Sequence, residues 1–110
     1  MNIRADSEEI RFRLSHEDVS VLLNDGMVRE EITLPIGDIR FLVEFDDQTR
    51  VDQRGGQVVF QLAPAIREKF KSQNDFKDPI VTIYHQINGK KIHYKLEVDV
   101  FQPKQRERRK

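Results

Sequence analysis

Residues 9–14, EIRFRL, and residues 57–62, QVVFQL, carry the same apolar pattern forty-eight residues apart. Ile10, Phe12 and Leu14 alternate with polar residues, which is the period of a β-strand with one buried face. The same spacing pairs further apolar residues along the chain: Ile3 with Val51, Leu22 with Phe70, Val28 with Phe76, and Ile32 with Ile80. We therefore predict an internal repeat, with one copy at residues 2–46 and the other at residues 50–101.

The first copy predicts a hairpin, a helix and a second hairpin. Strands at 2–5 and 9–14 flank a turn at Asp6-Ser7. Ser15 is a suitable N-cap for a helix, and Gly26 is suited to the left-handed conformation that ends one. A second hairpin at 28–34 and 39–45 follows, because apolar and polar residues alternate in both segments.

The second copy predicts the same order of elements. Strands at 49–53 and 57–62 flank the tight-turn sequence Arg54-Gly55-Gly56. Pro64 stands where the first residue of a helix is expected, and this helix ends near Ser72. Strands at 80–87 and 91–101 form the last hairpin around Asn88-Gly89, a favoured pair for a two-residue hairpin turn.

These elements predict an α+β fold that is mostly antiparallel β. About eight short strands and two helices form it, with a pseudo-twofold axis between the halves. Short connections favour antiparallel pairing of successive strands. Each helix has one apolar stripe and needs a sheet face to cover. An open sheet and a curled, barrel-like sheet both fit the pattern.

The chain is long enough for one domain, which we place at residues 1–103. Its formal net charge is zero, with 19 basic and 19 acidic residues. Five of the basic residues fall in the segment 104–110, which has one acid and is expected to be a disordered tail. The remaining body is therefore acidic, which argues against a nucleic-acid-binding domain surface.

Several classes of protein are excluded by composition. The chain has no cysteine, so it has no disulfide framework, thiolate zinc site or cysteine nucleophile. No apolar stretch approaches the roughly 18 residues that a membrane helix requires. The N-terminal residues lack the apolar core of a signal peptide. We expect a cytoplasmic protein that does not enter the membrane.

Polar residues on the second face of the strands are the candidates for binding. If the sheet is open, their mixed charges are ordinary surface chemistry. If the sheet curls, they line a groove that holds a small anionic ligand. The expected anion contacts are then four basic residues, because guanidinium and ammonium groups suit phosphate and carboxylate: Arg11, Arg13, Arg40 and Lys95.

No metal site, cofactor or catalytic set is expected. His93 and Glu97 share one face of one strand, but four residues of strand separate them by about 13 Å, too far for a chelating pair. The run Ser15-His16-Glu17-Asp18 resembles a hydrolytic cluster, yet a serine followed by acids is better explained as a helix N-terminus.

The basic tail offers one further hypothesis. It would contact RNA or an acidic protein electrostatically, through Arg106, Arg108 and Arg109. The tail contains no aromatic residue on which bases could stack. Nucleic-acid binding is not expected elsewhere in the chain.

Several segments resemble a small family of uncharacterised bacterial proteins of about this length. They are IRFRLS at 10–15 with the helix after it, DGMVREE at 25–31, Gly55-Gly56 with the strand after it, and LAPA at 62–65. The resemblance covers most of residues 1–100 and implies no function and no site residue. The last strand and the basic tail depart from the family pattern.

A second resemblance is to the architecture of tunnel-shaped, triphosphate-binding phosphohydrolases. Those enzymes carry alternating glutamates and a lysine on their first strand, which implies metal and phosphate binding there. The corresponding strand here has Glu9, Arg11 and Arg13, so the second acid is missing.

Three functional hypotheses follow. The first is a small non-enzymatic module that binds a protein or a small anionic ligand, with a homodimer through a sheet edge or face as one form. The second is an anion-binding or phosphohydrolase-like protein that uses the charged face. The third is an RNA-contacting accessory protein that uses the tail.

Overall fold

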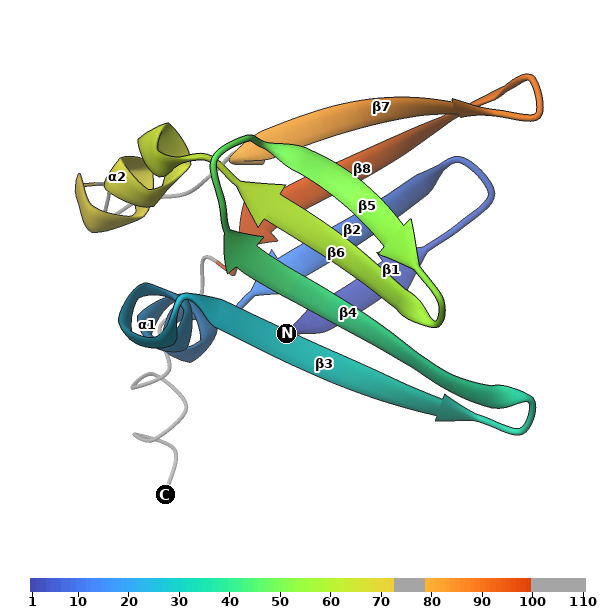
Figure 1. Ribbon diagram of the computed structural model, residues 1–110, viewed down its shortest axis with the longest axis horizontal. Helices are drawn as coiled ribbons and strands as arrows, with labels where there is room; N and C mark the ends of the chain where they lie inside the picture. Colours follow the sequence, from blue (N-terminus) through green and yellow to red (C-terminus); the bar gives the residue numbers. More distant parts are fainter. Residues whose placement is uncertain (73–78, 100–110) are drawn as a thin grey trace.

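The order hairpin, helix, hairpin occurs twice in the computed structural model, which describes residues 1–72 and 79–99 (Figure 1). The elements of this part of the chain are β1 (Asn2–Ala5), β2 (Glu9–Leu14), α1 (His16–Asp25), β3 (Met27–Leu34), β4 (Gly37–Phe45), β5 (Arg50–Arg54), β6 (Gln57–Leu62), α2 (Pro64–Ser72), β7 (Val81–Ile87) and β8 (Lys90–Val98). The predicted α+β class, mostly antiparallel, is confirmed.

The described strands form two four-stranded sheets and no closed barrel. Sheet A has the order β1-β2-β8-β7, and sheet B has the order β3-β4-β6-β5. Each sheet therefore joins one hairpin from each half of the chain. The hairpin pairs are antiparallel, but the central pairs β2–β8 and β4–β6 are parallel. These parallel pairs could not be predicted, because turn signals indicate pairing only between strands that follow one another in the chain.

The spacing of forty-eight residues does not extend to the second hairpins. Ile32 of β3 pairs with Ile39 of β4. The equivalent pair in the second half is His85 of β7 with Ile92 of β8, and each of these residues lies fifty-three positions after its counterpart. The gapless match of Ile32 to Ile80 was therefore wrong. The chain from α2 to β7 is longer than the chain from α1 to β3, and this shifts the register. Phe76, matched to Val28, lies outside the described residues.

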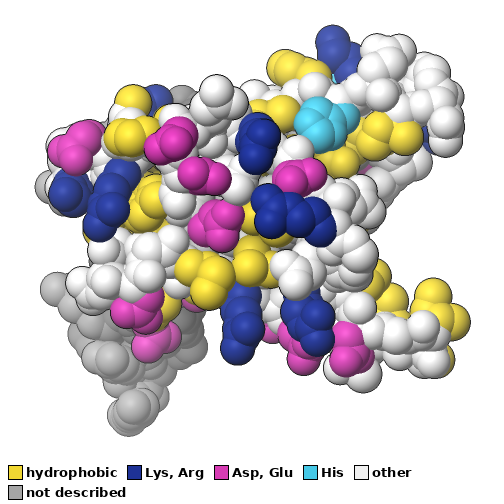
Figure 2. All heavy atoms as spheres, viewed as in Figure 1, with side chains coloured by type: hydrophobic (Ala, Val, Ile, Leu, Met, Phe, Trp, Pro, Cys, Tyr) yellow, Lys and Arg dark blue, Asp and Glu magenta, His cyan; other side chains and the backbone are white. Residues whose placement is uncertain are grey.

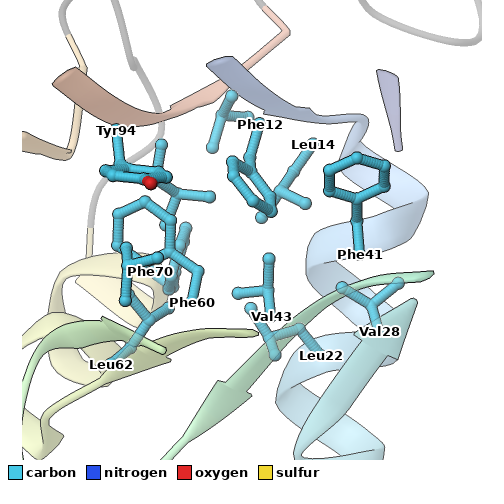
Figure 3. Close-up of a cluster of buried hydrophobic side chains, with 13 residues drawn as sticks. Phe12, Leu14, Leu22, Val28, Phe41, Val43, Phe60, Leu62, Phe70 and Tyr94 are labelled. Carbon is cyan, nitrogen blue, oxygen red and sulfur yellow. The ribbon is translucent and has the colours of Figure 1, made fainter. Parts of the chain in front are cut away.

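The hydrophobic core lies between the two sheets. Figure 3 shows side chains of sheet A, among them Phe12, Leu14 and Tyr94, pointing toward side chains of sheet B. The ring of Phe12 meets the rings of Phe41 and Phe60 edge to face, with centroids 5.7 and 5.3 Å away. Alternate residues of each strand supply this core, as the period-two pattern predicts.

The helices lie at one end of the molecule, and the tips of the β3–β4 and β7–β8 hairpins lie at the other (Figure 1). Each helix contributes a fully or nearly buried residue to the core, Leu22 from α1 and Phe70 from α2. The predicted helix boundaries at Ser15, Gly26 and Pro64 are confirmed. Among the described residues, neither helix has the length and apolar content needed to cross a membrane.

Candidate binding surface

Three of the four predicted anion contacts lie on the outer face of sheet A. Arg11 and Arg13 are in β2, and Lys95 is in the adjacent β8, in register with Arg11. The fourth, Arg40, is in β4 of sheet B, where its Nε donates to Glu31 at 2.8 Å. The sequence could not separate Arg40 from the others, because alternation assigns a face and not a sheet.

A row of basic residues crosses sheet A at one level. Arg4 of β1 is in register with Arg11 of β2, which is in register with Lys95 of β8. Neighbouring strands are about 4.8 Å apart, so the three side chains leave the sheet within about 10 Å of one another. Like charges at directly opposed positions destabilise a sheet unless they are neutralised.

Two carboxylates neutralise part of this row. Glu9 accepts hydrogen bonds from Lys95 and from Arg11, and the Lys95 Nζ–Glu9 Oε1 distance is 2.9 Å. These hydrogen bonds lower the pKa of Glu9, and the bond that Arg11 donates to Glu9 raises the pKa of Arg11. Glu97 Oε1 accepts from both Nε and Nη2 of Arg13, at 3.1 and 3.0 Å, and lies 3.9 Å from Arg11.

The same face continues to the edge strand β7. The ring of Tyr84, 54% exposed, has Lys91 Nζ 4.6 Å from its centroid and the His93 ring 4.7 Å away. Arg4 and Lys91 are exposed and form no ion pair within residues 1–72 and 79–99. We define the basic face by its charged residues, five cations and two carboxylates: Arg4, Arg11, Arg13, Lys91, Lys95, Glu9 and Glu97.

The outer face of sheet B has different chemistry at the corresponding positions. Leu42 and Val59 are opposed at its centre, where sheet A has Lys95 and Arg11. Gln61, only 2% exposed, donates to Glu44 at 2.9 Å and to Asp46 at 2.8 Å. Figure 2, seen from the side of sheet B, shows acidic and basic side chains intermixed. This face has no row of like charges.

The other residues that the sequence analysis considered either stabilise the fold or lie outside the described residues. Ser15 and Asp18 cap α1, because each side chain accepts a hydrogen bond from the other residue's backbone N–H. No group of three or more histidine or acidic residues in the described segments could hold a metal ion. Arg106, Arg108 and Arg109 fall in the part of the chain that is not described.

Two members of the basic face were missed in the sequence. Lys91 precedes His93 by two residues and so shares its face by alternation, a signal that was present. Arg4 lies in a strand of four residues, too short for alternation to be informative. Only its pairing with Arg11 places it on this face.

The comparisons with known proteins identify a family and no function. No curated protein and no solved structure matches the chain at a significant level. One family model, described as a family of unknown function (DUF7009), matches residues 1–102. Because this match covers nearly the whole chain, the protein belongs to the DUF7009 family of unknown function.

Proposed function

We propose that the protein is a small non-enzymatic binding module that takes an anionic ligand on the basic face. The observation that carries this proposal is the registered row of Arg4, Arg11 and Lys95. Glu9 neutralises only part of this row, and an anion bound at Arg4 and Arg11 would offset the repulsion that remains. Guanidinium groups also match the oxygens of phosphate and carboxylate in a bidentate manner.

The ion pairs within the basic face favour one position for the ligand. Glu9 already pairs with Lys95 and with Nε of Arg11, and Glu97 pairs with Arg13 and lies 3.9 Å from Nη1 of Arg11. Arg4 has no such partner among the described residues and stands beside Arg11 on the neighbouring strand. An anion that bridges Arg4 and Arg11 would therefore displace the fewest existing ion pairs.

The state of Glu9 supports binding rather than catalysis. A general acid at neutral pH needs a carboxyl whose pKa is raised. The hydrogen bonds from Lys95 and Arg11 instead lower the pKa of Glu9. A carboxylate held in this way organises its cationic neighbours and is a poor proton donor.

A titration with inorganic tripolyphosphate at low ionic strength tests the proposal. Amide NMR shifts should change in β1, β2 and β8, and Arg4→Gln and Arg11→Gln should each weaken the response. Arg40→Gln is the matched control, because it removes an ion-paired arginine from sheet B. Shifts of equal size on both sheets, or none, would contradict the proposal.

A turnover assay separates this proposal from the phosphohydrolase hypothesis. Tripolyphosphate should remain intact in the presence of magnesium or manganese and the protein. Hydrolysis that is lost in Glu9→Gln would show an enzyme, and would overturn the non-enzymatic assignment while leaving the basic face as the site.

We also infer that the two halves are copies of one ancestral unit. Support comes from the sheet orders, since β1-β2-β8-β7 and β5-β6-β4-β3 are the same order with the halves exchanged. The central pairs correspond too: Arg13 opposes Glu97 in sheet A, and Gln61 opposes Glu44 in sheet B. A chain whose second half is replaced by a copy of the first should fold if the halves are equivalent.

The expected location is a bacterial cytoplasm. The absence of cysteine fits a reducing compartment, and the resemblance to bacterial proteins supports the source. Fractionation of cells that express the full chain tests this expectation, and recovery from the membrane or periplasm would contradict it.

A further inference from the structure

The four edge strands of the two sheets differ in charge. β1 carries Arg4, β3 carries Arg29, Glu30 and Glu31, and β5 carries Arg50, Asp52 and Arg54. β7 has the sequence VTIYHQI, with no acid, no lysine or arginine and no proline. Charged residues and proline are the usual devices that keep an exposed strand edge from pairing with another chain. β7 has none of them.

The composition and exposure of β7 favour strand addition. Five of its seven residues, Val81, Thr82, Ile83, Tyr84 and Ile87, are β-branched or aromatic and suit a paired strand. Tyr84 and Ile87 are 54% and 42% exposed, large values for apolar side chains in a strand. Among the described strands β7 pairs only with β8, so one of its edges has unpaired backbone groups (Figure 1).

We propose that β7 is a dimerisation edge, and that it pairs antiparallel with β7 of a second copy about a twofold axis at Tyr84. Full overlap of Val81–Ile87 then places Tyr84 opposite Tyr84 of the other copy. The remaining opposed pairs are Val81 with Ile87, Thr82 with Gln86, and Ile83 with His85. Aromatic and β-branched pairs of this kind stabilise antiparallel strands.

The charge pattern selects a second copy of β7 over the other edges. Centred self-pairing of β5 would oppose Asp52 with itself, and centred self-pairing of β3 would oppose Glu30 with Glu31. Like charges directly opposite each other destabilise a pair. β1 has only four residues and a cation. Among the described edge strands of five or more residues, β7 alone meets its own copy without opposed charges.

The dimer would be one continuous sheet of eight strands. A twofold axis perpendicular to the sheet keeps the two outer faces on the same side, as closed isologous pairing requires. The two basic faces would then adjoin along Tyr84. The inference rests on the edge of β7 and is independent of the ligand proposed for that face.

Analytical ultracentrifugation of the full chain tests the proposal. The native protein should sediment with the mass of two copies of the 13.0 kDa chain. Tyr84→Lys places two lysines opposite each other at the axis and should halve the mass. Thr33→Lys is the control, since it adds the same charge to the exposed edge strand β3 and should leave the dimer intact. A monomeric native protein, or a dimeric Tyr84→Lys variant, would overturn the proposal.

Cysteine cross-linking tests the register without charge substitution. The chain has no cysteine, so a disulfide formed by a single-cysteine variant must join the introduced residues of two copies. Tyr84→Cys should form an intermolecular disulfide under mild oxidation. Thr82→Cys, opposite Gln86, should form much less, and Asp52→Cys on β5 should form none above background. Cross-linking that is equal at all three positions, or a β7 that pairs only with another protein, would refute self-pairing.

Discussion

At the scale of single residues, Glu9 is the carboxylate that links two cations of the basic face, Arg11 and Lys95. Hydrogen bonds from Lys95 and Arg11 lower the pKa of Glu9. We predict that carbon-detected NMR will find its carboxyl titrating below the ordinary glutamate value. Lys95→Met removes the larger of the two hydrogen-bond contributions and should raise the pKa of Glu9 toward that value.

A second carboxylate provides the control within the same spectra. Asp52 also has a lowered pKa, because Arg54 and the backbone of Gln53 donate to it, and it lies on sheet B. Lys95→Met should leave the titration of Asp52 unchanged. If Glu9 titrates alike in the native protein and in the variant, the Lys95 contact is not formed in solution.

Side-chain partners at this scale were only partly predictable. Alternation correctly placed Arg11 and Arg13 on one face of β2. It could not show that Glu97 lies beside Arg13, because these residues come together through the parallel pairing of strands eighty-four residues apart. Long-range pairing leaves no local signal, so the ion pairs of the basic face could not be inferred from the sequence.

At the scale of elements, the N-terminus of α1 is the best-defined boundary. Ser15 Oγ accepts from the Asp18 N–H at 3.0 Å, and Asp18 Oδ2 accepts from the Ser15 N–H at 2.9 Å. Ser15→Ala removes one of these bonds and should lower the free energy of unfolding by about 1 kcal/mol. Urea denaturation measures this change. Glu17→Gln, in the same turn but outside the cap, should change it by only a few tenths of a kcal/mol.

The contribution of Asp18 should depend on pH. Burial on its own raises the pKa of Asp18, but hydrogen bonds from the Met1 ammonium and from Ser15 outweigh it, and the net pKa is lowered. A carboxyl with a lower pKa in the folded state stabilises above its unfolded pKa, about 3.9. That stabilisation is lost as the pH falls through the folded value. Asp18→Asn should therefore destabilise clearly at pH 7 and far less near pH 2.

Equal destabilisation by Asp18→Asn at both pH values would contradict this account, and would show that shape rather than charge matters at this cap. The sequence predicted the element itself well, because Ser15, Gly26 and Pro64 are local signals for helix ends. It predicted strand ends less well. β8 ends at Val98, and residues 100 and 101 of the expected strand fall outside the described part.

At the scale of the whole molecule, each sheet needs both halves of the chain. The first hairpin pairs with the last in sheet A, and the two middle hairpins pair in sheet B. The class of fold was predictable from the alternation of apolar and polar residues and from the turn sequences, since both signals depend on residues that are close together in the chain. The division into two sheets was not, because it depends on which of several compatible hairpin edges meet. Because hairpins are exchanged between the halves, we expect the described strands to unfold as one cooperative unit.

Phe12 tests this cooperativity. Its ring is fully buried in sheet A and contacts Phe41 and Phe60 of sheet B. Phe12→Ala should lower the free energy of unfolding by about 3–5 kcal/mol, whereas Ile36→Ala, at a 95% exposed position, should change it by less than about 0.5 kcal/mol. Because neither sheet is complete without both halves, amide exchange should accelerate in β8 and in β6 to the same extent. Faster exchange confined to sheet A would show that the sheets open independently, and would contradict a single cooperative unit.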